Sequence, residues 1–273
     1  MSWFSRTPGK VFAVSSLRKS IRLILELAKR DLTERYSGAT LGAVWNFIYP
    51  LVSIVIYVVI FSSIMGARLP GSSSVYNYGI YLVAGIIPWT AFANTVSRMS
   101  SVYLEKKHII TKIHVDLRTF PAFIVVSETI TFAVTMGIFF VFLLATSSEI
   151  TYLIAFLPLI YFIQQLFAYS IGFFVGIFVV FLRDVKEMLA VVIQFWFWFT
   201  PIVYVYEILP DFAQRILIYN PALAFISGYQ DIFVFQRIPG LSYLGLVFVM
   251  SICLLLVGNF IFTRLEKDIR DFI

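Results

Sequence analysis

The sequence predicts an all-α integral membrane protein with six transmembrane helices, an N-terminal amphipathic helix and two short helices on the outer side of the membrane. Hydrophobic residues make up 60% of the 273 residues and charged residues 13%, and the mean hydropathy is +0.90. This composition is too apolar for a soluble globular protein. Long apolar segments recur along the chain, and basic residues gather at their ends, as topology determinants do.

Residues 1–40 are predicted to be an N-terminal segment that carries an amphipathic helix over residues 17–36. Apolar side chains fall on one helical face, and basic or polar side chains fall on the other. The apolar face comprises Leu17, Ile21, Ile24, Leu25, Ala28 and Leu32. We expect this helix to lie on the membrane surface, because no soluble domain accompanies it. The alternative is an exposed helix of a soluble domain.

Six apolar segments are predicted to cross the membrane within a domain of residues 41–263. They cover about residues 41–65, 78–97, 120–145, 152–182, 188–206 and 243–262. The first has no charged residue over about 25 positions, which is enough to cross a hydrocarbon core about 30 Å thick. A charged tail, residues 264–273, closes the chain.

The Lys and Arg residues divide unequally between the two sides of these segments. Eighteen of them precede the first span, follow the second or the fourth, or lie in the tail, whereas Arg68, Arg215 and Arg237 lie on the other side. Because cytoplasmic loops carry the excess of basic residues, both termini are predicted to be cytoplasmic. An odd number of spans would mix the two groups, so this bias also supports an even count.

The outer segment of residues 207–237 is too apolar for a simple loop. Asn220 and Pro221 interrupt it, and these residue types suit an N-cap and a first helical position. We therefore predict two short helices, over residues 211–219 and 221–235, which dip into the outer leaflet or lid a cavity. The alternative is an amphipathic loop that rests on the surface.

The motifs of several enzyme and binding classes are missing from the sequence. It has no Gly-rich phosphate loop ending in Gly-Lys-Ser/Thr, no His-Glu-x-x-His pattern and no Gly-x-Ser-x-Gly elbow. Cys253 has no other potential metal ligand near it in the sequence, and His108 and His114 lie outside the spans. We therefore predict no catalytic residue, metal site or nucleotide site on this chain. The net charge of +6 is explained by topology rather than by binding to nucleic acid.

Glu128 is the one acidic residue well inside a predicted span. An intramembrane carboxylate is a functional candidate by default. The alternative is a structural partner, with Arg98 near the end of the second span as the candidate cation. An intramembrane glycan-processing enzyme is disfavoured, because a lone carboxylate lacks a second catalytic group to act with it.

Two spans carry stripes of polar and aromatic residues at helical spacing. The stripe of the first span is Asn46, Tyr49, Ser53 and Tyr57, and that of the fifth is Gln194, Trp198, Pro201 and Tyr204. Polar side chains are costly in lipid, so these stripes should face another helix or a water-filled path. Aromatic rings with polar tips also suit sugars, which stack on rings and form hydrogen bonds. In the fourth span, Gly172-x-x-x-Gly176 predicts close helix packing.

A series of short motifs runs in order through nearly the whole chain. They are Arg30-Asp31-Leu32-x-x-Arg35-Tyr36, Leu41-Gly42-x-x-Trp45, Tyr49-Pro50-Leu51, Arg183-Asp184-Val185, Thr200-Pro201-Ile202-x-Tyr204 and Asn220-Pro221-x-x-x-x-Ile226-x-x-Tyr229. Together they resemble the membrane subunits of type-2 ATP-binding-cassette exporters for polysaccharides. That family includes exporters of O-antigen, capsule and teichoic acid, all of which move glycans carried on a lipid.

The resemblance implies a transport subunit rather than an enzyme. Two copies would form a homodimer in the cytoplasmic (inner) membrane and pair with two separate ATPase subunits that hold ATP and Mg. The cargo would be a lipid-linked glycan, with O-antigen on an undecaprenyl-type carrier as the first expectation.

The resemblance also implies roles for particular segments. Residues 17–36 would be an interface helix beside the ATPase, and spans one and five would line a channel at the homodimer axis. Residues 105–116 would be a coupling helix, with Glu105, Lys106, Lys107, His108, Ile109 and Lys112 as contacts. Residues 211–235 would be outer gate helices, with Phe212, Asn220, Pro221 and Phe225 as gate residues.

The basic residues near the predicted interface helix have two interpretations. Arg30 and Arg35, with Lys106 and Lys107, could bind a pyrophosphate head group. Alternatively, they are topology charges or contacts for anionic membrane lipid.

Two other transport classes remain open. An exporter of the same architecture for a small lipid or drug would need a compact, enclosed apolar site. A secondary transporter or ion channel would work without an ATPase partner, but it should carry more ionisable residues within its spans than Glu128 alone.

Overall fold

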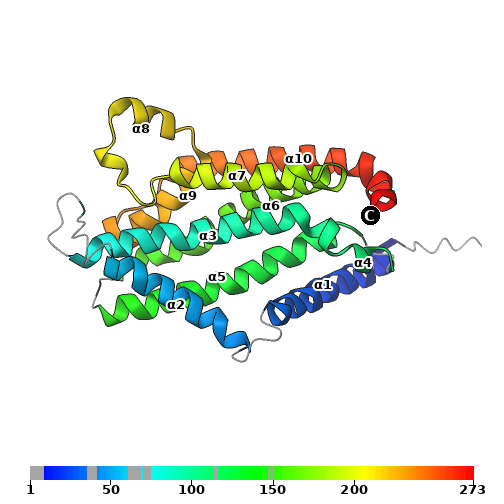
Figure 1. Cartoon of the computed structure of the whole chain (residues 1–273), viewed down its shortest axis with the longest axis horizontal. Coiled ribbons are helices and arrows are strands. Elements are labelled where there is room, and N and C mark those ends of the chain that lie inside the picture. Colours follow the sequence, from blue (N-terminus) through cyan, green and yellow to red (C-terminus); the bar gives the residue numbers. More distant parts are fainter. Residues whose placement is uncertain are drawn as a thin grey trace, which may run out of the picture.

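The computed structural model of the protein describes residues 9–35, 42–60, 69, 75–112, 116–146, 148 and 150–273. The described residues form helices and connecting turns, without a strand among them, and most helices run lengthwise in an elongated bundle (Figure 1). Four of the described helices are long and apolar enough to cross a membrane. The all-α class is therefore confirmed, while the count of six spans stays a prediction.

The four long helices form the body of the bundle. They are α3 (Val75–Glu105), α5 (Thr119–Ala145), α6 (Leu157–Phe181) and α10 (Leu241–Phe272), and a 3₁₀ turn, η3 (Tyr152–Phe156), leads into α6. α6 packs along both α3 and α10. The apolar window of α3 is 78% buried, against 22% for those of α5 and α10. α3 therefore lies at the centre, while α5 and α10 present most of their apolar surface outward.

Two glycines of α6 bring its backbone close to α3. A Cβ atom on Gly172 would lie 2.7 Å from Cβ of Met99, and one on Gly176 would lie 3.0 Å from the backbone oxygen of Met99. Real Cβ atoms essentially never approach another heavy atom within 3.0 Å. The predicted close packing through these two glycines is therefore confirmed.

Two shorter helices correspond to the first and fifth predicted spans. α2 (Trp45–Val58), which follows the 3₁₀ turn η1 (Gly42–Val44), has 14 residues, and α7 (Asp184–Trp198) has 15. Such helices are about 20 Å long, which is less than the thickness of a hydrocarbon core. Part of the first predicted span, residues 61–65, lies outside the described residues.

The predicted fifth span, residues 188–206, is wrong at its C-terminal end. α7 ends at Trp198, and the chain turns at Thr200 and Pro201. Proline has no N–H for a helical hydrogen bond and disfavours a helical conformation in the residue before it. Tyr204 therefore does not continue the helical stripe of Gln194 and Trp198.

The N-terminal helix, the loop after α3 and the C-terminus gather at one end of the bundle (Figure 1). α1 (Gly9–Glu34) packs on α5, and a single turn, α4 (Lys107–Ile110), follows α3. The predicted coupling helix of residues 105–116 is thus divided: α3 continues to Glu105, α4 covers four residues, and residues 113–115 lie outside the described part. The charged tail of residues 264–273 is helical almost to its end, because α10 continues to Phe272.

Part of the predicted apolar face of α1 is buried in the protein, and part of it is exposed. Leu27, Ala28 and Asp31 are buried against the bundle, whereas Ile21 and Leu25 are about half exposed. The side chains of residues 11–19 are outside the described part. The helix therefore has a face toward the protein and a separate apolar surface that is available to lipid.

The opposite end of the bundle holds the two short helices predicted for residues 207–237. The elements there are η4 (Tyr206–Ile208), α8 (Asp211–Leu217), α9 (Pro221–Gln230) and a π-helical turn, η5 (Asp231–Phe235). α9 packs against α3, α6 and α10, and Phe225 is completely buried. α8 projects from the bundle, with Phe212 exposed (Figure 1). The prediction of two helices is confirmed, and the interpretation as a surface loop is wrong for α9.

Asn220 fastens the start of α9 to the end of α7. Its Oδ1 accepts hydrogen bonds from the backbone N–H of Ala222 at 3.0 Å and from Nε1 of Trp196 at 2.7 Å. Its Nδ2 donates to the backbone oxygen of Phe199 at 2.9 Å and to Oγ1 of Thr200 at 3.0 Å. The predicted N-cap is confirmed, and the same side chain also fixes the turn after α7.

Replacement of Asn220 should loosen this junction. We expect Asn220→Ala to lower the free energy of unfolding by about 2 kcal/mol, because it removes a helix cap and leaves buried donors unpaired. Trp196 should become more mobile, which tryptophan emission can detect. Asn259→Ala, at an exposed position of α10, is the matched control and should have little effect; equal losses in both variants would contradict the assignment.

Candidate functional site

A cluster of charged side chains joins α1 to the membrane helices. It comprises Asp31 in α1, Arg35 directly after it, Arg98 in α3, and Ser127 and Glu128 in α5. These residues lie close together because α1 packs on α5 and α5 packs on α3. The cluster lies at the end of the bundle that holds α4 and the C-terminus.

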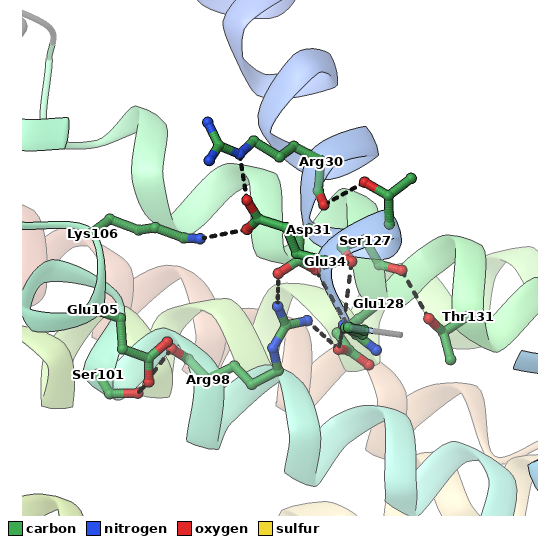
Figure 2. Close-up of polar contacts among 12 residues, drawn as sticks. Arg30, Asp31, Glu34, Arg98, Ser101, Glu105, Lys106, Ser127, Glu128 and Thr131 are labelled. Carbon is green, nitrogen blue, oxygen red and sulfur yellow. Dashed lines mark hydrogen bonds and ion pairs between the residues drawn. The ribbon is translucent and has the colours of Figure 1, made fainter. Parts of the chain in front are cut away.

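Arg98 bridges the two carboxylates of the cluster (Figure 2). One guanidinium nitrogen lies 2.5 Å from Glu128 Oε1, and the other lies 2.5 Å from Asp31 Oδ1. Arg35 also pairs with both acids, with its Nε 3.4 Å from Asp31 Oδ2 and a second nitrogen in contact with Glu128. Ser127 donates a hydrogen bond to Asp31 Oδ2 at 2.5 Å.

The burial of these groups explains why they are paired. Glu128 is 1% exposed and Asp31 8%, and an ionised carboxylate at such a depth is costly without a partner. Two acids and two arginines make the cluster neutral overall. The pairing of Glu128 with Arg98 that the sequence suggested is confirmed. The part that Asp31 and Ser127 take in the cluster was not predicted, although Asp31 lies one turn from Arg35 on the same side of a helix.

A cavity of about 430 Å³, with both polar and apolar lining residues, opens beside this cluster, between α2, α3 and α5. Its polar lining comes from every wall: Arg35 and Glu128, Tyr49, Ser53 and Tyr57 of α2, Thr90 and Asn94 of α3, and Thr131 and Thr135 of α5. Phe132 and Ile54 are among its apolar lining residues. Hydroxyl, amide and charged groups therefore converge on a space that is large enough for part of a polar ligand.

The two predicted stripes lie in different surroundings. Tyr49, Ser53 and Tyr57 line the cavity, whereas the side chain of Asn46 is outside the described part. Gln194 and Trp198 are exposed on α7 and do not line this cavity. Tyr204 lies in the turn after α7, where its hydroxyl donates to the backbone oxygen of Trp198 at 2.9 Å. The first stripe therefore meets α3 and α5 of its own chain, and the second faces away from the bundle.

None of the predicted coupling residues is fully buried. Lys107, His108 and Lys112 are exposed, Ile109 is half-buried, and the adjacent Ile110 is buried. Lys106 lies 3.7 Å from Glu34 of α1 and over the ring of Phe123. Glu105 accepts a hydrogen bond from Ser101 at 2.5 Å and lies 3.8 Å from Lys186 at the start of α7. The loop after α3 thus contacts both α1 and α7.

The basic residues considered for a head group are mostly engaged with acids. Arg30 lies 2.5 Å from Glu34 (Figure 2), and this hydrogen bond lowers the pKa of the Glu34 carboxyl. Arg35 turns inward to Glu128, and Lys106 pairs with Glu34. The structure therefore does not gather these cations into one exposed patch. Arg35 is the member of the group that also lines the cavity.

This arrangement defines the class of the protein. Several apolar helices, joined to an amphipathic helix by buried ion pairs, form a helical membrane domain. The sequence model of the family described as "ABC-2 type transporter" matches residues 22–234. The chain belongs to this family, and it is a multi-pass membrane protein.

Three relatives extend the similarity over almost the full length. The chain is 25% identical over 251 residues to the O-antigen export system permease protein RfbA of Myxococcus xanthus, which covers 91% of this chain and 94% of that protein. It is 26% and 25% identical to two proteins of the same name from Klebsiella pneumoniae, over 246 residues, 89% of this chain and 92% of each relative. The similarity thus extends over about nine tenths of the chain.

Proposed function

We propose that this chain is the transmembrane subunit of an ATP-driven exporter that moves lipid-linked polysaccharide, most specifically O-antigen, across the cytoplasmic membrane. The observation that carries the proposal is the near full-length similarity to three O-antigen export permeases. An undecaprenyl-type lipid is the expected carrier. The tyrosines and hydroxyl groups among the lining of the cavity beside α2 are suited to contacts with a glycan.

The exposed faces of α2 and α7 are the proposed walls of the export channel. Tyr49 is 72% exposed and Trp198 59%, and each lies among other exposed apolar residues of its helix. Large apolar surfaces of this kind favour contact with lipid or with a second subunit. In a homodimer, α2 and α7 of two copies would enclose a path at the two-fold axis, lined by aromatic rings that suit sugar faces.

ATP hydrolysis belongs in this proposal to a separate partner subunit that holds ATP and Mg. The sequence has no phosphate-binding loop of its own. α4 and α1 lie at the same end of the bundle (Figure 1), where an ATPase would contact both. The exposed Lys107, His108 and Lys112 form a basic surface, which suits a groove with acidic residues on the partner. By the excess of basic residues, this end faces the cytoplasm.

The test of the proposed function is purification of the tagged chain from its native membrane, with mass spectrometry of the co-purified proteins and an ATP hydrolysis assay. We expect a stoichiometric ATPase subunit. In cells that lack the chain, surface polysaccharide should disappear and return when the chain is restored. A folded chain without an ATPase partner, in cells with unchanged surface polysaccharide, would refute the proposal.

Reversal of charge on the coupling surface should disconnect the two subunits. We expect Lys107→Glu combined with Lys112→Glu to reduce polysaccharide export by about tenfold or more, because like charges at an interface cost several kcal/mol. The chain itself should stay folded, since both side chains are exposed. Lys267→Glu, at an exposed position near the end of α10, is the control. Unchanged export and ATPase stimulation in the double variant would contradict the proposed coupling role.

Two alternative functions fit the geometry less well. A drug exporter needs an enclosed apolar site, whereas the cavity beside α2 combines apolar side chains with the charged Arg35 and Glu128 and several hydroxyl groups. A secondary transporter needs a carboxylate that can exchange protons or ions, whereas Glu128 is held by both Arg98 and Arg35.

A further inference from the structure

A second cavity, of about 240 Å³, lies at the end of the bundle opposite to α1 and α4. The start of α3, the turn after α7, the helices α9 and η5, and the start of α10 enclose it. Because η5 continues α9 directly, four separate parts of the chain contribute to its walls, and the cavity is distinct from the exposed faces of α2 and α7. By the distribution of basic residues, this end faces away from the cytoplasm.

Aromatic side chains form much of the wall of this outer cavity. Tyr81, Tyr206, Phe235 and Tyr243 all line it. The hydroxyl of Tyr81 donates to the backbone oxygens of Pro201 and Tyr204, at 3.0 Å each, and its ring meets Phe235 edge-on with centroids 6.2 Å apart. These two rings are therefore held in place, as the wall of a binding site must be.

Three charged side chains meet at the same cavity. Arg237 Nε lies 2.6 Å from Asp231 Oδ1, and a terminal nitrogen of Arg237 lies 3.6 Å from Glu207 Oε1. The guanidinium also lies over the ring of Phe235, 4.8 Å from its centroid. The side chain of Asp231 is 9% exposed and that of Glu207 46%, so one carboxylate is deep in the site and the other lies near its opening. The three groups carry a net charge of −1.

We propose that this outer cavity binds one neutral sugar residue of the glycan as it leaves the protein. The inference rests on the proposed export function. Ring C–H groups of a sugar would stack on Tyr206 and Tyr243, while its hydroxyls would donate to Glu207 and accept from Arg237. The net negative charge disfavours phosphate and acidic sugars. The small volume fits a single ring and excludes a folded stretch of chain.

Binding of simple sugars tests the inference directly. The complex should be placed in lipid nanodiscs after removal of every glycoside detergent, since such detergents carry sugar head groups. Saturation-transfer NMR with methyl α-mannoside, methyl β-glucoside and N-acetylglucosamine as probes should show contact with at least one of them. We expect Glu207→Gln and Tyr243→Ala each to weaken that binding by about tenfold, the cost of one charged hydrogen bond or one stacking contact.

Matched controls separate the cavity from the rest of the outer surface. Asp211→Asn changes an exposed acid of α8, and Tyr152→Ala removes a tyrosine that is 80% exposed at the start of η3. Both should bind the sugars as the unaltered protein does. The inference is overturned if none of the three sugars binds to the folded complex, or if the cavity variants and the controls bind equally.

The export assay distinguishes this failure from failure of the proposed function. If cells that carry the unaltered chain export polysaccharide but the outer cavity binds no sugar, the inference fails and the export function stands. If restoring the chain has no effect on surface polysaccharide, the proposed function fails first. Acidic probes, such as glucuronate, should bind more weakly than methyl β-glucoside, and the reverse order would also overturn the inference.

Discussion

Glu128→Gln is expected to destabilise the folded protein by about 3 kcal/mol, at the lower end of the cost of breaking a buried ion pair. The substitution keeps the size of the side chain but leaves Asp31 as the one carboxylate facing both Arg35 and Arg98. The cluster would then carry an uncompensated positive charge. We place the cost at the lower end because the arginine side chains are 22% and 27% exposed, so water can screen part of that charge. Denaturation followed by tryptophan fluorescence measures the loss.

Two further variants define what Glu128 does. Glu26→Gln, at an exposed position of α1, is the control and should change stability by less than about 0.5 kcal/mol. The double variant Glu128→Gln with Arg98→Gln should recover part of the stability, because it restores neutrality to the cluster. If Glu128→Gln abolished export without loss of stability, the carboxylate would act on cargo or coupling rather than as a structural anchor.

The charge cluster also links α1 to the cavity beside α2. Asp31 and Arg35 belong to α1 and its end, while Glu128 and Arg35 line the cavity beside α2. A shift of α1 relative to α5 would therefore rearrange charges at the edge of the cavity.

Much of the fold follows from properties that hydropathy and residue type report directly. Segment length and apolar content predict α3, α5, α6 and α10, because a helix must satisfy its own backbone hydrogen bonds in lipid. Asn220 and Pro221 predict the start of α9 through capping and the fixed φ of proline. The candidate partner of Glu128 was found because few cations lie at the depth of a span.

Other features depend on contacts that a single sequence does not specify. Hydropathy does not distinguish lipid from protein as the surroundings of an apolar side chain. Leu25 and Ala28 lie on one predicted apolar face, but Ala28 is buried in the protein while Leu25 is exposed and available to lipid. The end of α7 at Trp198 depends on Thr200 and Pro201, whose effect the apolar pattern hides. The cavity is formed by three helices from different parts of the chain, and only their packing brings Tyr57 and Glu128 to one space.

Gly172→Leu is expected to destabilise the folded protein strongly, because Gly172 lies where α6 packs closely against α3. The Cβ atom alone would lie 2.7 Å from Cβ of Met99, which is at the base of its side chain and cannot swing away. α3 and α6 would have to separate along a contact that also includes the bond from Gln164 Nε2 to the backbone oxygen of Pro88. Overpacking of a tight contact costs up to about 3 kcal/mol, and more where backbone must move.

Gly137→Leu in α5 is the matched control, because no heavy atom lies within 4 Å of a Cβ at that position. Both substitutions replace a glycine by leucine within an apolar helix, so their cost as residues in lipid should be alike. We expect the Gly172→Leu variant to yield little folded protein, and the Gly137→Leu variant to match the unaltered chain in yield and unfolding midpoint. Equal stability of the two variants would show that Gly172 does not limit the distance between α3 and α6. The close contact of α6 with α3 would then depend on Gly176.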